Sequence, residues 1–270
     1  MSSIIQAIIL GVIQGLTEFI PVSSSGHLIA VPRLMGWQDM GLSFDVALHL
    51  GTLVAVIAYF RKDWVRILSG FIGRRRHTQI TAESRLLIPI LVACVPAAIV
   101  GYLWDDFIEQ TLRQWYWVAG ALVLIAFVML AAERVSKRTR SLAEMNYVDY
   151  VIIGCAQALA LFPGVSRSGI TITAGLFRDI ERATAARFSF LMSTPIIVGA
   201  GVLKLKDVFQ AGLPADEVVL FVVGFVAAAL SGYAAIRFLM NYLRRASLNV
   251  FIVYRIAFAA FMAVVFLTRP

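Results

Sequence analysis

The sequence predicts an all-α polytopic membrane protein, with six transmembrane helices and two re-entrant helical hairpins arranged as an inverted repeat. Three observations support this prediction: the apolar composition, the length of the apolar runs, and two similar polar segments placed between shorter apolar runs. Of the 270 residues, 60% are hydrophobic and 15% are charged. Soluble domains are nearer to half apolar and a quarter charged, so the composition alone indicates a membrane protein.

Six apolar runs have the length of a membrane span or come close to it. A helix rises about 1.5 Å per residue and a hydrocarbon core is about 30 Å thick, so a span needs roughly 20 apolar residues. The six runs are 44–60, 86–103, 115–132, 188–203, 218–238 and 250–267. We treat the whole chain, residues 1–270, as a single integral membrane domain.

Four further apolar segments do not qualify as ordinary spans. Segments 4–20 and 147–162 end at prolines. Segments 27–35 and 169–177 are too short to cross the membrane. We interpret the two pairs as re-entrant hairpins. Three true spans in each half would give the same parity of crossings, but the short segments disfavour that alternative.

The distribution of positive charge orients the predicted spans. Lys and Arg concentrate in the loops 61–85, 134–140 and 241–248, which the positive-inside rule places in the cytoplasm. The acidic loop 105–109 then lies outside, as do the segment 204–217 and both termini. The net charge of +8 is therefore explained by membrane orientation, and it does not indicate a nucleic-acid partner.

Several other kinds of segment and site are not expected. The N-terminal segment has neither a basic n-region nor a small-residue cleavage site, so we expect mature protein and not a signal peptide. Cys94 and Cys155 lie far apart in apolar runs, which fits neither a disulfide framework nor a metal site. No phosphate-binding loop of the G-x-x-x-x-G-K-[ST] kind occurs, so ATP-driven function is unsupported.

The two halves of the chain share a motif. Residues 11–26, GVIQGLTEFIPVSSSG, align with residues 154–169, GCAQALALFPGVSRSG, at an offset of 143, with eight identities in sixteen positions. This similarity indicates an internal duplication, with repeats at about 1–140 and 144–270. Because the first copy starts outside and the second inside, the repeat is inverted, and its two broken loops should meet near the membrane midplane.

An acid and an amide lie in the apolar helix before the first loop. Gln14 and Glu18 are four residues apart, hence on one helix face. A carboxylate within the membrane is costly and by default marks a functional site. The alternative is a structural Glu18 bonded across a helix pair. Gly11 and Gly15 predict close packing against another helix.

The first loop, VSSSGH, supplies hydroxyls and an imidazole. Ser23, Ser24 and Ser25, with the backbone amides that open the next helix, would bind an anion. His27 would act as a nucleophile or as a general acid or base. The plainer alternative is that the serines are N-caps and His27 makes a satisfied polar contact.

The second loop, PGVSRSGIT, replaces the middle serine with Arg167. A guanidinium stays charged and matches phosphate oxygens, and Glu18 is its expected counter-ion. Ser166, Ser168 and Thr171 would complete an oxygen-binding nest. The alternative is an Arg167–Glu18 pair that only locks the two repeats together.

Three other polar residues receive plainer interpretations. His49, in the run 44–60, is interpreted as a packing contact. Arg255 is expected to extend to the cytoplasmic surface as a structural residue. Asp45 lies near the outer end of its run, and whether it faces the mouth of the site is left open.

The two motifs also carry a family resemblance. QGLTEFIPVSSSGH and PGVSRSGIT closely resemble the signature motifs of the bacterial undecaprenyl-diphosphate phosphatases, the bacitracin-resistance protein family, and the likeness extends along essentially the whole chain. The resemblance implies a multi-pass enzyme of the bacterial plasma membrane, with its active site facing the outer side. Such an enzyme hydrolyses undecaprenyl diphosphate to undecaprenyl phosphate and inorganic phosphate, recycling the lipid carrier for peptidoglycan synthesis. A divalent cation, Mg²⁺ or Ca²⁺, is also implied.

The motifs and the resemblance together define a candidate site. The expected catalytic residues are Glu18, His27, Ser24 and Arg167, the expected substrate contacts are Gln14, Ser23, Ser25, Ser166, Ser168 and Thr171, and Glu18 is the expected metal ligand. The motif allows glutamate at position 14, where this chain has glutamine, so metal binding depends more on Glu18 or on substrate oxygens. The nucleophile, which is His27, Ser24 or water, stays open.

Other functions are weighed against this one. Type-2 phosphatidic-acid phosphatases also use an SGH and an SR motif, but this chain has no histidine after Ser166-Arg167 where that family needs one. A secondary transporter or a flippase, for an anionic solute or a polyprenyl phosphate, is the main alternative, because inverted repeats with broken helices are typical of transporters. The expected partners are the lipid substrate and membrane lipids, and a homodimer is left open.

Overall fold

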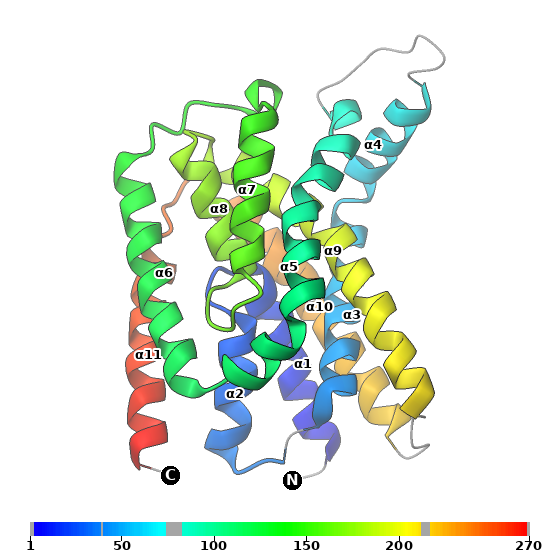
Figure 1. The fold of residues 1–270 in the computed structure, drawn as a ribbon, viewed down its shortest axis with the longest axis vertical. Coiled ribbons are helices and arrows are strands. Elements are labelled where there is room, and N and C mark those ends of the chain that lie inside the picture. The colour runs from blue at the N-terminus through cyan, green and yellow to red at the C-terminus, as the bar shows by residue number, and fades with distance from the viewer. Residues whose placement is uncertain (1–2, 39, 74–82, 212–216, 269–270) are drawn as a thin grey trace.

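The computed structural model describes residues 3–38, 40–73, 83–211 and 217–268. Within these residues the chain forms eleven α-helices, two short 3-10 helices and one isolated β-bridge. Most of the helices run along one long axis, and the chain ends lie at the same end of the molecule (Figure 1). The predicted all-α class is confirmed.

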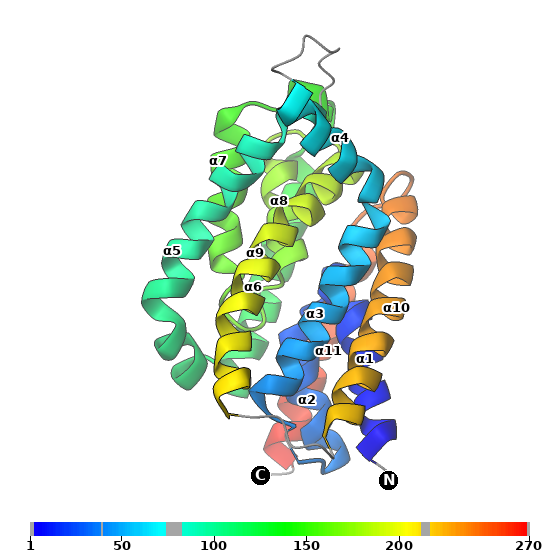
Figure 2. The ribbon, with the colours of Figure 1, turned by 90° about the vertical axis from the view of Figure 1, so that its right-hand side faces the viewer.

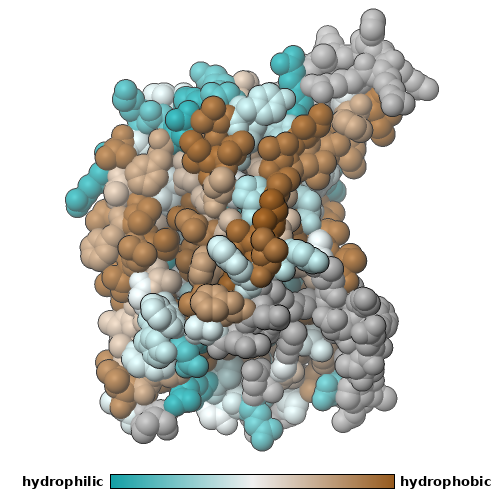
Figure 3. All heavy atoms as spheres, in the orientation of Figure 1, coloured by the Kyte–Doolittle hydropathy of each residue, from teal (hydrophilic) through white to brown (hydrophobic). Residues whose placement is uncertain are grey.

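Five of the described helices are long and apolar enough to cross a membrane. They are α5 (Leu87–Thr111), α6 (Trp115–Val135), α9 (Arg182–Ala211), α10 (Val218–Tyr242) and α11 (Asn249–Thr268). A sixth span is formed if α3 (Gly41–Tyr59) and α4 (Arg61–Gly73), which meet at a bend of 72°, count as one. All six apolar runs predicted from the sequence lie in these helices to within one residue. Hydrophobic side chains cover the middle of the face shown in Figure 3, and hydrophilic ones gather toward its ends.

The four shorter apolar segments also form helices, and these lie in two pairs. Helices α1 (Ser3–Phe19) and α2 (Ser24–Met35) enter from the end of the molecule that holds the termini. Helices α7 (Tyr147–Leu159) and α8 (Arg167–Phe177) enter from the opposite end. The turns of both pairs therefore face the interior of the bundle, as Figures 1 and 2 show.

The predicted close packing at Gly11 and Gly15 is confirmed. A Cβ atom added at Gly11 would lie 2.5 Å from the Gly224 carbonyl oxygen, and one at Gly15 would lie 2.5 Å from that of Ala228. Both carbonyls belong to α10, so glycine lets the backbones of α1 and α10 come closer than any side chain would permit.

Two buried carboxylates organise the end of the molecule opposite the termini. Glu133, at the end of α6, and Asp149, at the start of α7, each pair with two arginines. The arginine partners are Arg138 and Arg182 for Glu133, and Arg140 and Arg178 for Asp149. Beside Asp149, the pKa of the Arg140 guanidinium is raised, chiefly by the hydrogen bond between them. These pairs join α6, α7, α8 and α9 where the chain is most basic.

Three segments predicted as loops are at least partly helical. Residues 61–73 form α4, because Trp64, Ile67, Leu68 and Phe71 recur at helical spacing and form an apolar stripe. Helix α5 continues through residues 105–109, and α9 continues to Ala211. Hydropathy marks the thickness of the membrane, whereas a helix continues as long as its backbone hydrogen bonds do. Residues 74–82, with their three arginines, and 212–216 lie outside the described part of the chain.

Candidate active site

Prolines interrupt both helix pairs in the interior of the molecule. Pro21 follows the end of α1 and Pro163 follows the end of α7. A proline lacks the N–H that would continue the helical ladder, and it disfavours helical geometry in the residue before it. The chain therefore turns in each case, and a new helix starts after a serine.

The two turns have the same local structure. Ser23 and Ser166 are the N-cap residues of α2 and α8, and they have unusual positive φ angles of 75° and 72°. Each serine side chain accepts a hydrogen bond from the backbone N–H three residues later, at 3.4 and 3.2 Å. Each is also within hydrogen-bond distance of the serine two residues on, Ser25 at 3.1 Å and Ser168 at 3.3 Å. Both turns thus present the start of a helix, where unpaired N–H groups favour an anion.

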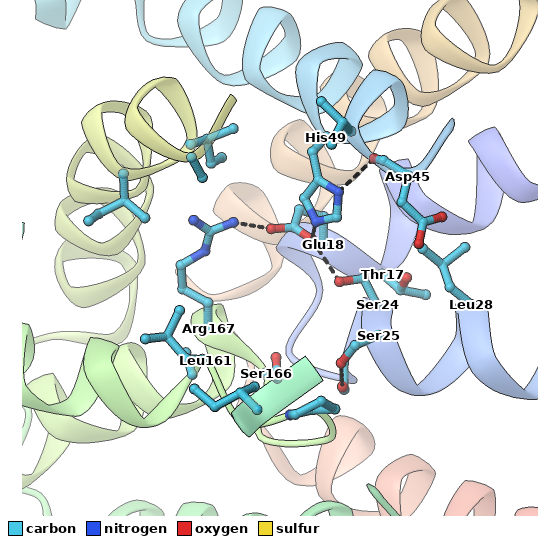
Figure 4. Close-up of a pocket in the computed structure, with 18 of the residues that line it drawn as sticks. Thr17, Glu18, Ser24, Ser25, Leu28, Asp45, His49, Leu161, Ser166 and Arg167 are labelled. Atoms are coloured by element: carbon cyan, nitrogen blue, oxygen red, sulfur yellow. Dashed lines mark hydrogen bonds and ion pairs between the residues drawn. The ribbon is translucent and has the colours of Figure 1, made fainter. Parts of the chain in front are cut away.

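Glu18 is the centre of the polar cluster between the turns. One carboxylate oxygen, Oε1, pairs with the Arg167 guanidinium from the other half of the chain. The other, Oε2, accepts hydrogen bonds from the Ser24 hydroxyl at 2.7 Å and from the Gln14 amide at 3.0 Å. Figure 4 shows the Ser24 and Arg167 side chains pointing at this carboxylate from opposite sides. The expected Arg167–Glu18 pair is present.

A cavity of about 370 Å³ lies beside this cluster. Its polar wall includes six of the predicted site residues: Glu18, Ser23, Ser24, Ser25, Ser166 and Arg167. The rest of the wall is largely apolar and includes Leu28, Leu50, Ile108, Leu161, Ile196 and Ile197. A cavity with an ionic side and an apolar side suits an amphiphile that has an anionic head.

His27 does not line this cavity. Its Nδ1 donates to the Ser23 carbonyl at 2.7 Å, and its Nε2 lies 2.7 Å from the Tyr254 hydroxyl of α11. The ring is buried and stacks on Phe258, with the ring centroids 4.0 Å apart. Both ring nitrogens are therefore occupied, and the imidazole holds the backbone of the first turn against α11.

Three predicted substrate contacts also lie behind the cavity wall. Gln14 is fully buried and bonds to Glu18. Ser168 is buried beside Ser166. Thr171 donates to the Arg167 backbone carbonyl at 2.7 Å and lies 2.6 Å from the Ser189 hydroxyl of α9. These residues support the cluster and do not face the space where a ligand would sit.

Residues of α3 and α7 that were not predicted as site residues do line the cavity. His49 places Nε2 3.9 Å from Glu18 Oε2, while its Nδ1 donates to the Asp45 carbonyl at 2.8 Å. The Asp45 carboxylate lies 3.8 Å from Arg113, which also lines the cavity, as does Gln157. The interpretation of His49 as a packing contact is wrong. The signal for it was the four-residue spacing of Asp45 and His49 in an apolar run, the same spacing that drew attention to Gln14 and Glu18.

The interpretation of Arg255 as a surface residue is also wrong. Its side chain is fully buried, and all of its hydrogen bonds within the described part of the chain go to backbone carbonyls. The acceptors are Pro21 of the first turn, Gly164 of the second turn, and Ala121 and Leu122 of α6. Carbonyls freed by the two helix breaks need donors, and a guanidinium with five N–H groups supplies several at once.

The described residues contain no ready-made metal cage. No group of three or more His, Cys, Asp or Glu side chains among them could hold a metal ion. Both Glu18 oxygens already have partners, and Asp45 is the other carboxylate in the cavity wall. Magnesium is commonly held by one or two carboxylates together with substrate phosphates and water. The donor set therefore fits a cation that arrives with a phosphorylated substrate.

The chain is similar to known proteins over nearly its full length. A family model described as "Bacitracin resistance protein BacA" matches residues 7–261. The chain belongs to the BacA family. A relative from Rubrobacter xylanophilus is 48% identical over 271 residues, covering 99% of this chain and all of its own length. One from Moorella thermoacetica is 48% identical over 268 residues, covering 99% of each chain.

The BacA family is the one predicted from the two motifs, and that prediction is confirmed. A third relative, from Elusimicrobium minutum, is 45% identical over 266 residues, covering 98% of this chain and 99% of its own. All three relatives carry the name undecaprenyl-diphosphatase. Because the similarity spans both helix pairs and all the candidate spans, this BacA-family chain is a multi-pass membrane protein.

Proposed function

We propose that this BacA-family protein is an undecaprenyl-diphosphatase, which hydrolyses undecaprenyl diphosphate to undecaprenyl phosphate and inorganic phosphate. The observation that carries the proposal is the Ser24–Glu18–Arg167 cluster on the polar side of an otherwise apolar cavity. The full-length similarity to proteins of that name supports it.

Arg167 and Glu18 act in sequence during substrate binding. With the cavity empty, the two side chains neutralise each other. A terminal phosphate entering the cavity competes with the carboxylate for the guanidinium, whose fork of donors matches phosphate oxygens. The exchange binds the phosphate and leaves Glu18 free to accept a proton.

Ser24 is the nucleophile in this proposal. Its hydroxyl already donates to Glu18 Oε2 at 2.7 Å, which is the contact a general base needs. The Ser24 oxygen forms a bond to the terminal phosphorus, its proton passes to Glu18, and the anhydride bond breaks to release undecaprenyl phosphate. Water then cleaves the phosphoserine, with its hydroxyl passing to phosphorus and its proton to the Ser24 oxygen, and Glu18 releases the proton it accepted as inorganic phosphate departs. The loop amides and Arg167 stabilise the charge that spreads over the phosphoryl oxygens.

His27 holds the first turn in place in this mechanism. Both of its ring nitrogens are occupied and its ring is stacked on Phe258, so attack on phosphorus would require the imidazole to leave its site. Direct attack by water, with Glu18 as base, is the remaining alternative.

The proposal includes a divalent cation that would bind together with the substrate. A bound Mg²⁺ or Ca²⁺ would neutralise negative charge on the diphosphate oxygens. Glu18, the predicted metal ligand, would hold it in the cavity, with Asp45 as the second carboxylate of the wall. Ser24 and Arg167 perform their steps on the phosphoryl group itself.

The inverted repeat and the orientation complete the proposal. The matching φ angles at Ser23 and Ser166, and the entry of the two helix pairs from opposite ends, support an inverted duplication with two re-entrant hairpins. The basic end of the molecule would face the cytoplasm. The wall of the cavity includes Asp45 and Arg113, which come from the end of the molecule opposite the basic end. The cavity would then open toward the outer side.

A transporter or flippase remains the second candidate. Opposed hairpins around a central charged site are also the arrangement of secondary transporters. The contact between Ser24 and the Glu18 carboxylate favours the enzyme, because a solute site has no need of a hydroxyl aligned with a base.

The decisive experiment measures phosphate release by the purified full-length protein in detergent, from a polyprenyl diphosphate with Mg²⁺. We expect steady release that EDTA suppresses. Arg167→Ala and Ser24→Ala should each lower kcat by about a thousandfold or more, because they remove charge stabilisation and the nucleophile. Ser25→Ala is the matched control, and it should cost about tenfold or less, because the Ser25 hydroxyl accepts from the Gly164 N–H.

Two outcomes would contradict the proposal. Uptake of an anionic solute into liposomes by folded protein that releases no phosphate would favour the transporter. Acid quenching during turnover separates the nucleophiles, because phosphoserine survives acid and phosphohistidine does not. Label on His27 that survives an alkaline quench but is lost in an acid quench would overturn the assignment of Ser24.

A further inference from the structure

Gln14 and Gln157 occupy matching positions in the two similar segments, at the offset of 143. In the first half the Gln14 amide donates to Glu18, one helical turn later, at 3.0 Å. In the second half the position that matches Glu18 is Leu161. Gln157 therefore lacks the carboxylate that its counterpart uses.

Gln157 lines the cavity with most of its hydrogen-bonding capacity unused. Its side chain is 2% exposed, and neither amide atom has a nitrogen or oxygen hydrogen-bond partner within the described residues. Among these residues, the one group that interacts with the amide is the Cys94 thiol, through a side-chain hydrogen bond, and a thiol is a weak hydrogen-bonding group that leaves most of the capacity of the amide unused. The Cys94 proton is donated to the Met192 carbonyl at 3.4 Å.

We propose that the Gln157 amide binds an oxygen of the second phosphoryl group of a prenyl diphosphate, the one that stays on the lipid. This inference rests on the proposed function and adds a second phosphate subsite to it. The terminal phosphate binds between Ser24 and Arg167, and the retained phosphate lies toward Gln157.

The free-energy cost of leaving a buried amide unpaired favours a ligand oxygen next to Gln157. A buried polar group without a partner costs about 1–3 kcal/mol, and a ligand oxygen that accepts a hydrogen bond from the amide would recover part of that free energy. A phosphate oxygen would accept from Nε2, in the way that the Glu18 carboxylate accepts from Gln14. Because the amide is neutral, it can bind the retained phosphate without adding a second cation that would slow release of the product.

The position of the subsite also fits the shape of the substrate. Leu161, one turn beyond Gln157, and Ile196 of α9 belong to the apolar part of the same cavity wall. A diphosphate with its terminal phosphate at Arg167 and its other phosphate at Gln157 would direct the prenyl chain along that apolar wall.

The test compares binding of two probes to purified full-length protein by calorimetry, with Mg²⁺ in every sample. The first probe is farnesyl methylenediphosphonate, which cannot be hydrolysed, and the second is inorganic phosphate. Gln157→Leu should weaken the diphosphonate Kd by about tenfold. The Kd for inorganic phosphate, which needs only the Arg167 side, should change less than twofold. The Tm of the empty protein should stay the same or rise.

Ser136→Ala is the matched control, because the Ser136 hydroxyl is also buried, has no hydrogen-bond partner among the residues that the structure describes, and lies outside the cavity. It should leave both Kd values unchanged. Gln157→Asn, which keeps the amide but shortens its reach, should weaken the diphosphonate several-fold and provides a second folded variant.

Three results would overturn the inference: an unchanged diphosphonate Kd in Gln157→Leu, an equal loss of both probes, or a lowered Tm without a change in binding. Because the first probe is not hydrolysed, the result does not depend on turnover. A wild-type protein that binds the probe through Gln157 but releases no phosphate from the natural substrate would contradict the proposed function and leave the subsite standing.

Discussion

Arg167 and Arg255 are both arginines in apolar surroundings, but different groups stabilise them. Arg167 pairs with Glu18 and borders the cavity, so an anionic ligand can compete for it. Arg255 donates to four backbone carbonyls from both helix breaks and from α6, and it does not line the cavity. The first arginine is therefore available for binding, whereas the second joins the two turns that carry the serines.

Substitution of Arg255 should disrupt both turns. Arg255→Met removes every donor from the freed carbonyls, each of which then costs roughly 1–3 kcal/mol. We expect a lowered Tm in detergent and a loss of phosphate release of tenfold or more. Arg255→Lys should be intermediate, because an ammonium keeps the charge but cannot reach the same set of acceptors.

Arg244→Met is the control for loss of an arginine, since Arg244 is exposed, and it should behave as wild type. Normal stability and turnover in Arg255→Met would show that the carbonyls find other donors and that the arginine does not position the turns.

Helices α1 and α10 show how small residues decide which elements touch. Gly15 packs so closely on α10 that a Cβ atom would lie 2.0 Å from Ser231 Oγ and 2.5 Å from the Ala228 carbonyl. Glu18 lies on α1 less than one turn beyond Gly15. The distance between α1 and α10 therefore determines where the Glu18 carboxylate meets Arg167.

Gly15→Ala should force α1 away from α10. Overpacking of this kind typically costs about 1–3 kcal/mol, so we expect a lower Tm together with a reduced kcat, measured by thermal unfolding and phosphate release. Gly120→Ala is the control, because a Cβ atom at Gly120 of α6 would meet nothing within 4 Å. Equal effects of the two substitutions would contradict the role assigned to the α1–α10 contact.

At the scale of the whole molecule, charge is distributed unevenly along the long axis. The arginine clusters around Glu133 and Asp149 lie at the end from which α7 and α8 enter, and the termini lie at the other end. The α1–α2 turn and the α7–α8 turn meet between these ends. Such an uneven distribution of charge would give the proposed site a single preferred side in the membrane.

Cysteine labelling should reveal that side. In a background with Cys94→Ala and Cys155→Ser, single cysteines replace Gln114, in the turn between α5 and α6, or Arg244, at the basic end. Both residues are exposed. An impermeant maleimide added to intact cells should label the Gln114→Cys protein at once and the Arg244→Cys protein only after permeabilisation. The opposite pattern would reverse the proposed orientation.

Much of the site could be predicted because some residues have properties that depend little on their surroundings. Glu18 and Arg167 are charges in apolar runs, and such charges need partners wherever the chain places them. The serine turns follow prolines, which end helices in any fold. His27, Arg255 and His49 were harder, because each of these side chains can satisfy itself in several ways. The partners that determine where these side chains point are Tyr254 for His27, Gly164 for Arg255 and Glu18 for His49, and all three lie on other elements.

The sequence by itself determined the family, the helical class, the six apolar runs and the two broken helices, because hydropathy, proline positions and motifs are local properties of the chain. Only the tertiary structure decided which polar groups share the cavity. His27 bonds to α11 and Arg255 to the carbonyls of the two turns, whereas His49 and Gln157 belong to the wall of the cavity that Glu18 also lines. The direction of a side chain depends on how helices distant in sequence pack together, and no local pattern contains that information.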